Sequence, residues 1–121
     1  RFNPTSGQLE VANAGHPPVL VRHQQTWQQL EATAPPLGVL PDLLIQPQRF
    51  TLQPEDLVLC YSDGFSEIET PQGLWGQAGL LNAVPDAIQD VQALTDRIVA
   101  ASQVAGDRRD DQTLVTMRYI R

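Results

Sequence analysis

Short apolar runs separated by turn residues dominate the first half of the chain and predict strands. Strands are expected at residues 9–12, 19–21 and 27–30. Leu57–Tyr61 is an unbroken apolar run and predicts the most deeply buried strand of the chain. Ile45–Leu52 alternates less regularly and contains Pro47, which has no N–H to donate to a neighbouring strand. We therefore expect that segment at the edge of a sheet.

The second half of the chain changes to a helical period. Val91, Leu94 and Ile98 recur at threes and fours, which places them on one apolar face of a helix. Asp90 can cap the start of this helix and Gly106 can end it. A shorter helix is expected around residues 80–81, and residues 113–119 alternate as a final strand. This order of elements predicts an α+β layered domain with an antiparallel sheet.

Composition narrows the functional classes. The 121 residues suffice for one domain or a piece of one, and the hydrophobic fraction of 41% excludes a disordered chain. The net charge is −6 and every basic residue is an arginine, so we expect no nucleic-acid partner and no contact with an anionic membrane. The single cysteine, Cys60, lies in an apolar run and is interpreted as a buried structural thiol, which fits a reducing, cytoplasmic setting.

Acidic residues lie at the ends of two predicted core strands. Asp63 follows the strand that ends at Tyr61, and Asp110 and Asp111 precede the strand that begins at Thr113. If these strands are antiparallel neighbours, the end of one lies beside the start of the other, and Asp63 meets Asp110. Two carboxylates held together repel each other, and a hard cation such as Mg²⁺ or Mn²⁺ can neutralise them.

Each of these features also has a plainer interpretation. Gly64 would let the backbone turn sharply away after a ligand at Asp63, but the sequence around these two residues is also an ordinary turn sequence. Asp110 and Asp111 could instead pair on the surface with the preceding arginines, Arg108 and Arg109.

Two further polar residues remain open. His16, in a proline-rich turn, could be a ligand or base, but we expect it to hold the turn by hydrogen bonding. Glu67 is expected to be a solvated loop residue, although it is close enough to Asp63 in sequence to position that side chain without binding a metal itself.

Several short segments form a recognisable pattern when taken in order along the chain: Asn13–Pro18, Pro36–Gly38, Asp56–Glu67, Gly73, Gly76 and Asp110–Thr113. Together they resemble the bacterial branch of the type 2C (PPM) metal-dependent serine phosphatases. That branch includes stage II sporulation protein E and the sigma-factor-regulating phosphatases. No single segment is specific, but their combination in this order is.

The resemblance implies a β-sandwich flanked by helices, with a two-metal site at its edge. It implies that Asp63 and Asp110 are catalytic metal ligands for Mg²⁺ or Mn²⁺, with Asp111 in a supporting role. In that family, metal-activated water hydrolyses phosphoserine or phosphothreonine on a protein. The implied partners are a phosphorylated regulatory protein resembling an anti-anti-sigma factor and a sensory or receiver domain in the parent chain.

One departure from the family pattern shapes these expectations. The family carries a Gly-Asp followed by Gly-His-Gly nearer its N-terminus, and residues 1–121 have no counterpart. We therefore expect this chain to be the C-terminal portion of the phosphatase domain, with an incomplete two-metal site and no activity by itself. Pairing between copies into a homodimer is one expected remedy for exposed sheet edges. The alternative is a non-catalytic pseudo-phosphatase that binds a partner or dimerises.

Overall fold

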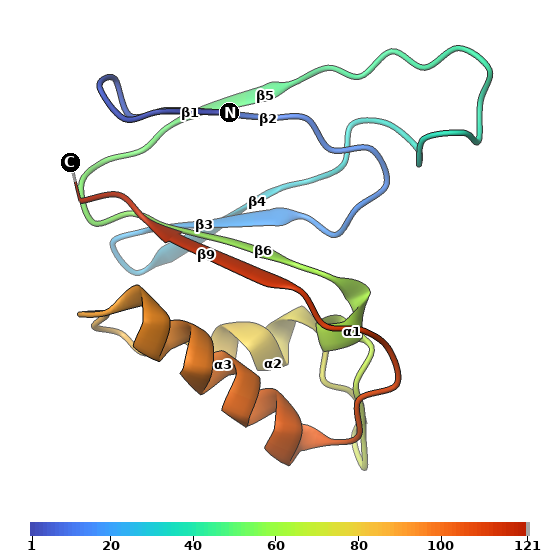
Figure 1. Ribbon diagram of the computed structural model, residues 1–121, viewed down its shortest axis with the longest axis vertical. Coiled ribbons are helices and arrows are strands. Elements are labelled where there is room, and N and C mark those ends of the chain that lie inside the picture. The colour runs from blue at the N-terminus through green and yellow to red at the C-terminus, as the bar shows by residue number, and fades with distance from the viewer. Residues whose placement is uncertain (121) are drawn as a thin grey trace. The chain divides into compact units, whose positions relative to one another are not determined.

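The computed structural model describes residues 1–120 (Figure 1), which group into two compact units. The first unit comprises Arg1–Cys60 together with the end of the chain from Met117, and the second comprises Tyr61–Thr116. The first unit holds most of the strands and the second holds the helices.

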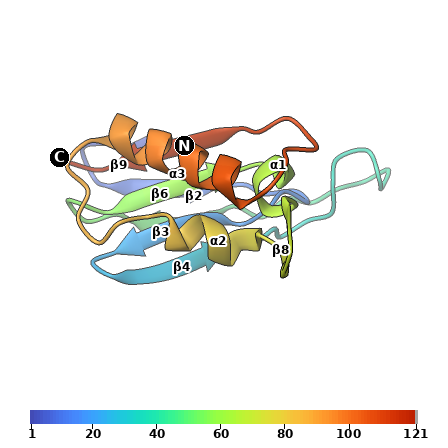
Figure 2. The ribbon, with the colours of Figure 1, turned by 90° about the horizontal axis from the view of Figure 1, so that it is seen from below.

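The first unit is built from antiparallel strands. They are β1 (Phe2–Asn3), β2 (Gln8–Val11), β3 (Val19–His23), β4 (Thr26–Leu30), β5 (Gln48–Thr51) and β6 (Leu57–Tyr61). One sheet has the order β1-β2-β5, and the other has the order β4-β3-β6-β9, where β9 is Leu114–Arg118. Figure 2 shows β4, β3, β6 and β9 following one another in that order. The strand β5 begins directly after Pro47 and lies at a sheet edge, as the sequence predicted.

The two sheets of the first unit enclose an apolar core, which makes this unit a β-sandwich (Figure 1). Its buried members come from both sheets and from the segments that follow them. They are Leu9, Val21, Leu30, Leu52, Val58 and Tyr119. Most residues of β3 and β6 are buried on both faces, which explains why their sequences are apolar runs rather than alternating patterns.

The second unit contains three helices and a short hairpin. The elements are α1 (Asp63–Ser66), β7 (Glu69–Thr70), β8 (Gly73–Leu74), α2 (Gly76–Asn82) and α3 (Val91–Ala105). The side chain of Asp90 accepts a hydrogen bond from the Gln92 N–H at 3.0 Å, so the predicted cap of α3 is confirmed. Leu94 and Ile98 are buried, and the Thr95 hydroxyl lies 2.7 Å from the Thr116 hydroxyl of β9. These contacts hold α3 against the first half of β9.

The observed elements confirm the predicted α+β class and correct some local expectations. The sequence around Asp63 and Gly64 starts the helix α1, whereas a turn was expected. The hairpin β7–β8 and the strand β1 were not predicted, because each strand is only two residues long. Among residues 1–120, no helix has the length and apolar character that a membrane crossing requires.

Candidate metal site

The end of β6 lies against the start of β9. The Ser62 N–H donates to the Thr113 carbonyl at 3.0 Å, and the Thr113 N–H donates to the Ser62 hydroxyl at 2.9 Å. Farther along, the Tyr119 N–H donates to the Asp56 carbonyl. Residue numbers rise along one strand while they fall along the other, so the two strands are antiparallel. The segments that carry Asp63 and Asp110 therefore leave the same end of a strand pair.

Gly64 explains how closely these two segments approach. It lies in α1, and a Cβ atom at this position would be 2.1 Å from the carbonyl oxygen of Asp111. The Gln112 side-chain amide donates to the Gly64 carbonyl at 3.1 Å and closes the contact. Because Gly64 has ordinary helical geometry, the expectation of a sharp glycine turn is wrong. The glycine is needed because backbone atoms of another segment occupy the space of a side chain.

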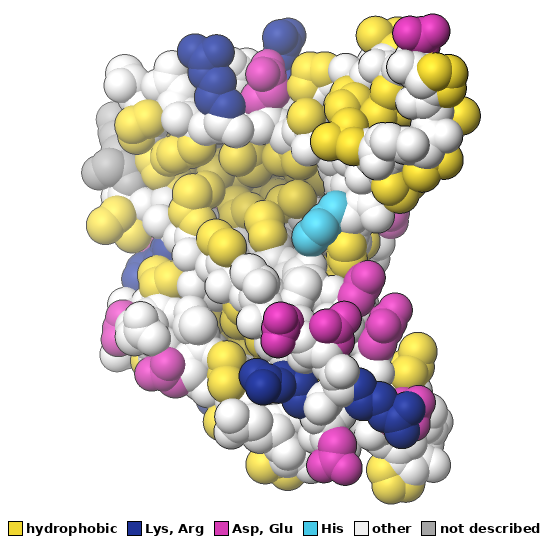
Figure 3. Space-filling model, turned by 45° about the vertical axis from the view of Figure 1, so that its right-hand side comes forward, with side chains coloured by type: hydrophobic (Ala, Val, Ile, Leu, Met, Phe, Trp, Pro, Cys, Tyr) yellow, Lys and Arg dark blue, Asp and Glu magenta, His cyan; other side chains and the backbone are white. Residues whose placement is uncertain are grey.

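Both candidate carboxylates are accessible to solvent. Asp63 is the first residue of α1, and Asp110 lies in the loop before β9, where its Oδ1 accepts the Asp111 N–H at 2.7 Å. Within residues 1–120, Asp110 and Asp111 form no ion pair with the preceding arginines. Arg109 instead pairs with Glu69, with 2.8 Å between Nη2 and Oε2. Figure 3 shows acidic side chains gathered beside a band of arginines on this face of the second unit.

A shallow pocket of about 310 Å³ borders the candidate site. It is lined by Gly64, Glu67, Glu69, Leu74, Arg109 and Asp110. Three of the six are acids and one is a cation, so the pocket is anionic without a bound metal. Glu67, expected to be a solvated loop residue or a support for Asp63, is exposed and lines this pocket together with Asp110.

The donor chemistry fits a hard cation that keeps most of its water. Within the described part of the chain, no three His, Cys, Asp or Glu side chains are grouped so as to hold a metal ion. Mg²⁺ is commonly bound through one or two carboxylates, with water and substrate phosphate filling the remaining positions. Asp63 and Asp110 supply donors of that kind, and the lining of the pocket that includes Asp110 contains no thiolate or imidazole.

The contacts of His16 and the burial of Cys60 agree with structural roles for both residues. His16 is exposed, and its Nδ1 lies 3.0 Å from the Pro17 carbonyl. Asn13 belongs to a segment that matches the family pattern, and its role is structural: it is buried and organises this turn through hydrogen bonds to the His16 N–H and to the carbonyls of His16 and Pro17. Cys60 is half-buried, and burial raises the pKa of its thiol, which keeps it protonated and unreactive.

The fold is similar to that of solved PP2C phosphatase domains. The phosphatase domain of SiaA from Pseudomonas aeruginosa aligns with a TM-score of 0.78 and 20% identity over 93% of this chain and 47% of that one. The SpoIIE phosphatase domain from Bacillus subtilis, presoaked with Mn, aligns with a TM-score of 0.72 and 17% identity over 98% of this chain and 53% of that one. The predicted fold class is therefore confirmed.

The sequence pattern described as "Stage II sporulation protein E (SpoIIE)" matches residues 1–120, and the chain belongs to this family of PP2C-type phosphatases. The phosphoserine phosphatase RsbP of Bacillus subtilis (strain 168) is 29% identical over 112 residues, which are 89% of this chain and 27% of that protein. The RsbU and RsbW domains of Rv1364c from Mycobacterium tuberculosis align with 26% identity and a TM-score of 0.68, over 97% of this chain and 34% of that one. The chain thus spans about a quarter of the RsbP relative and about half of the solved phosphatase domains.

Proposed function

We propose that residues 1–121 form the C-terminal portion of a metal-dependent protein phosphatase domain that hydrolyses phosphoserine or phosphothreonine on a regulatory protein. Asp63 and Asp110 are its metal ligands and catalytic residues in this proposal. The observation that carries it is the hydrogen-bonded contact of Ser62 and Gly64 with the segment Asp111–Thr113 in a member of this family. That contact supports the proposal because it brings together the two chain segments that carry these carboxylates.

Four residues would form and support the metal site. Asp63 and Asp110 would bind the metal ion through carboxylate oxygens. Ser62 and Gln112 hold the two segments together through the hydrogen bonds described above. When bound, Mg²⁺ or Mn²⁺ would activate a water molecule and neutralise charge on the phosphoryl oxygens. Arg109 and Glu67 are among the residues that line the adjacent pocket, which is open enough for a phosphorylated side chain on a protein surface.

The relatives indicate the kind of substrate. RsbP is named a phosphoserine phosphatase, and the Mycobacterium structure joins an RsbU domain to an RsbW domain. We propose a phosphorylated substrate of the anti-anti-sigma-factor type, acted on in the cytoplasm, with a sensory or receiver domain in the same parent protein. The SpoIIE structure presoaked with Mn makes Mn²⁺ the first metal to test.

Metal binding tests the site directly. Mn²⁺ binding is measured by electron paramagnetic resonance for the wild type, Asp63→Asn, Asp110→Asn and the matched control Asp107→Asn, which removes an exposed acid from the same loop outside the proposed ligand pair. We expect affinity to fall at least tenfold in the first two variants, because each loses half of the protein ligands, and to stay within about twofold in the control. Equal Mn²⁺ affinity in all four proteins would remove Asp63 and Asp110 from the site.

Hydrolysis is then measured with p-nitrophenyl phosphate and Mn²⁺, for the 121-residue chain and for any longer gene product that contains it. We expect turnover in the longer form, none in the 121-residue chain, and loss of turnover in Asp63→Ala and Asp110→Ala. Full activity of Asp63→Ala would refute its assignment as a catalytic ligand.

A non-catalytic binding module is the second candidate function. The observation that favours it is the absence, within residues 1–120, of a group of three or more residues able to hold a metal. A folded longer form that neither binds Mn²⁺ nor hydrolyses p-nitrophenyl phosphate would support this candidate over the enzyme.

A further inference from the structure

We propose that Arg109 is a substrate-binding residue that donates hydrogen bonds to the phosphoryl oxygens of the substrate. This inference rests on the proposed function, because it places the phosphoryl group beside Asp110. It adds a cationic contact from a residue of this chain that is not itself a proposed metal ligand.

Position is the first argument for this role. Arg109 directly precedes Asp110, and both side chains line the same pocket. Among the six lining residues, Arg109 is the one cation, and Glu67, Glu69 and Asp110 are the acids. A phosphorylated side chain that reaches a metal held by Asp110 must therefore enter a pocket where Arg109 is the available guanidinium.

The orientation of Arg109 is set by a second segment. Its guanidinium pairs with Glu69 of β7 at 2.8 Å, and a backbone bridge between Glu69 and Asp107 brings the same two segments together. An arginine side chain carries five N–H donors, so the pair with one carboxylate leaves donors for a second anion. The pair is exposed and contributes little to stability, so a positioning role accounts for it better than a stabilising one.

Charge explains why phosphoryl binding here should require metal. Three carboxylates repel a phosphate dianion, and Arg109 alone cannot offset them. A divalent cation at Asp63 and Asp110 offsets the negative charge of the pocket lining, and Arg109 then adds a planar, bidentate donor set that matches two phosphoryl oxygens. We therefore expect O-phosphoserine to bind only when the metal is present.

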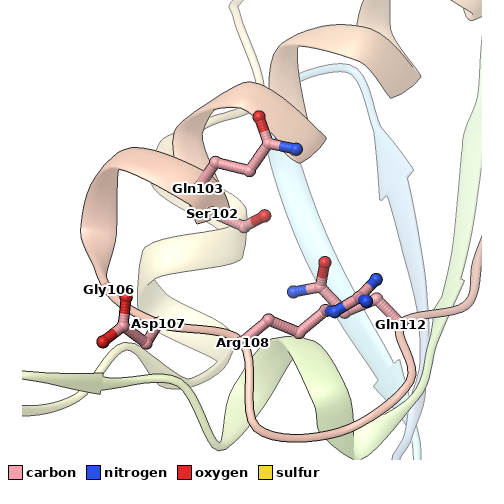
Figure 4. A pocket seen from close by; sticks show the side chains of 6 residues that line it. All are labelled: Ser102, Gln103, Gly106, Asp107, Arg108 and Gln112. Atoms are coloured by element: carbon pink, nitrogen blue, oxygen red, sulfur yellow. The ribbon is translucent and has the colours of Figure 1, made fainter.

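Arg108 provides a matched control in the neighbouring position. Its side chain lines a different hollow, of about 360 Å³, together with Ser102, Gln103 and Gln112 (Figure 4). Among residues 1–120 it has no carboxylate partner, and both arginines are exposed. Removing either arginine changes the net charge equally, but only Arg109 lines the pocket of Asp110.

The test measures equilibrium binding, so it does not require turnover. O-phosphoserine is titrated by isothermal calorimetry into wild type, Arg109→Ala, Arg109→Lys and Arg108→Ala at saturating Mg²⁺, with serine as the ligand control. We expect Arg109→Ala to lose about tenfold or more in affinity, because it lacks two charge-assisted hydrogen bonds. Arg109→Lys should recover part of that loss as a point charge, and Arg108→Ala should stay within about twofold.

The outcomes separate this inference from the proposed function. If the wild type binds metal and O-phosphoserine while Arg109→Ala and Arg108→Ala bind equally well, the role of Arg109 is refuted and the metal site stands. If the wild type binds metal but no O-phosphoserine, the inference also fails. If the folded wild type binds no metal, the proposed function fails and takes this inference with it. Circular dichroism of each variant checks that folding is unchanged.

Discussion

Replacing Gly64 by alanine tests the close approach on which the candidate site depends. The new Cβ would be 2.1 Å from the Asp111 carbonyl oxygen, 2.8 Å from the Asp111 carbonyl carbon and 3.2 Å from the Gln112 Cα. All three are backbone atoms, so no side chain can rotate away to make room. The segment before β9 must therefore move, and the carboxylate of Asp110 moves with it.

The cost of this substitution can be estimated from three contributions. Forced repacking against backbone costs about 1–3 kcal/mol. Displacing Gln112 from the Gly64 carbonyl loses a hydrogen bond, which contributes about 0.5–1.5 kcal/mol. Alanine favours a helix over glycine by up to about 1 kcal/mol, and less in a helix as short as α1. The net expectation is a loss of about 2–3 kcal/mol, which leaves a domain of ordinary stability folded.

Urea unfolding followed by tryptophan fluorescence measures this loss, and Mn²⁺ binding measures its effect on the site. Gly38→Ala is the control, because Gly38 has a positive φ of 87° but no atom within 4 Å of the added Cβ. The control should lose about 1–2 kcal/mol from backbone strain and keep its Mn²⁺ affinity. A Gly64→Ala protein with wild-type stability and wild-type Mn²⁺ affinity would refute the close-approach argument.

Two further predictions concern residues away from the site. The buried carboxylate of Asp56 accepts a hydrogen bond from the Gln53 N–H at 2.8 Å, and its Oδ1 lies 2.7 Å from His23 Nδ1. Asp56→Ala should therefore lower the free energy of unfolding, measured in urea, by about 2 kcal/mol or more. His23→Ala should lower it clearly less, because the His23 side chain is 45% exposed, and equal losses would contradict this account. The raised pKa of Cys60 means that above about pH 8.5 the unfolded thiol ionises before the folded one, so stability should fall as pH rises. Cys60→Ser should flatten that part of the stability profile, and an unchanged slope would show that another group causes it.

Much of the framework follows from local sequence. The apolar run Leu57–Tyr61 is a strand over its whole predicted length, because burial on both faces requires an unbroken apolar segment. The helix of Val91–Ala105 begins after its predicted cap, Asp90, because that side chain satisfies a free N–H at the first turn. In both cases the residues that indicate the element lie within it or directly beside it in sequence.

The site depends on contacts that sequence order does not contain. The reason for Gly64 became visible only once the Asp111 carbonyl was found in the space of its side chain. Likewise, the local sequence indicated that Arg109 could pair with Asp110 or Asp111, which follow it directly. In the folded chain, the guanidinium of Arg109 instead pairs with Glu69 of the β7–β8 hairpin. The residue types that follow Tyr61 already indicated a possible metal ligand. Their approach to the residues before Thr113 depends on the pairing of strands that are distant in sequence. The sequence alone shows which side chains could bind a metal, but tertiary packing decides which of them lie close together.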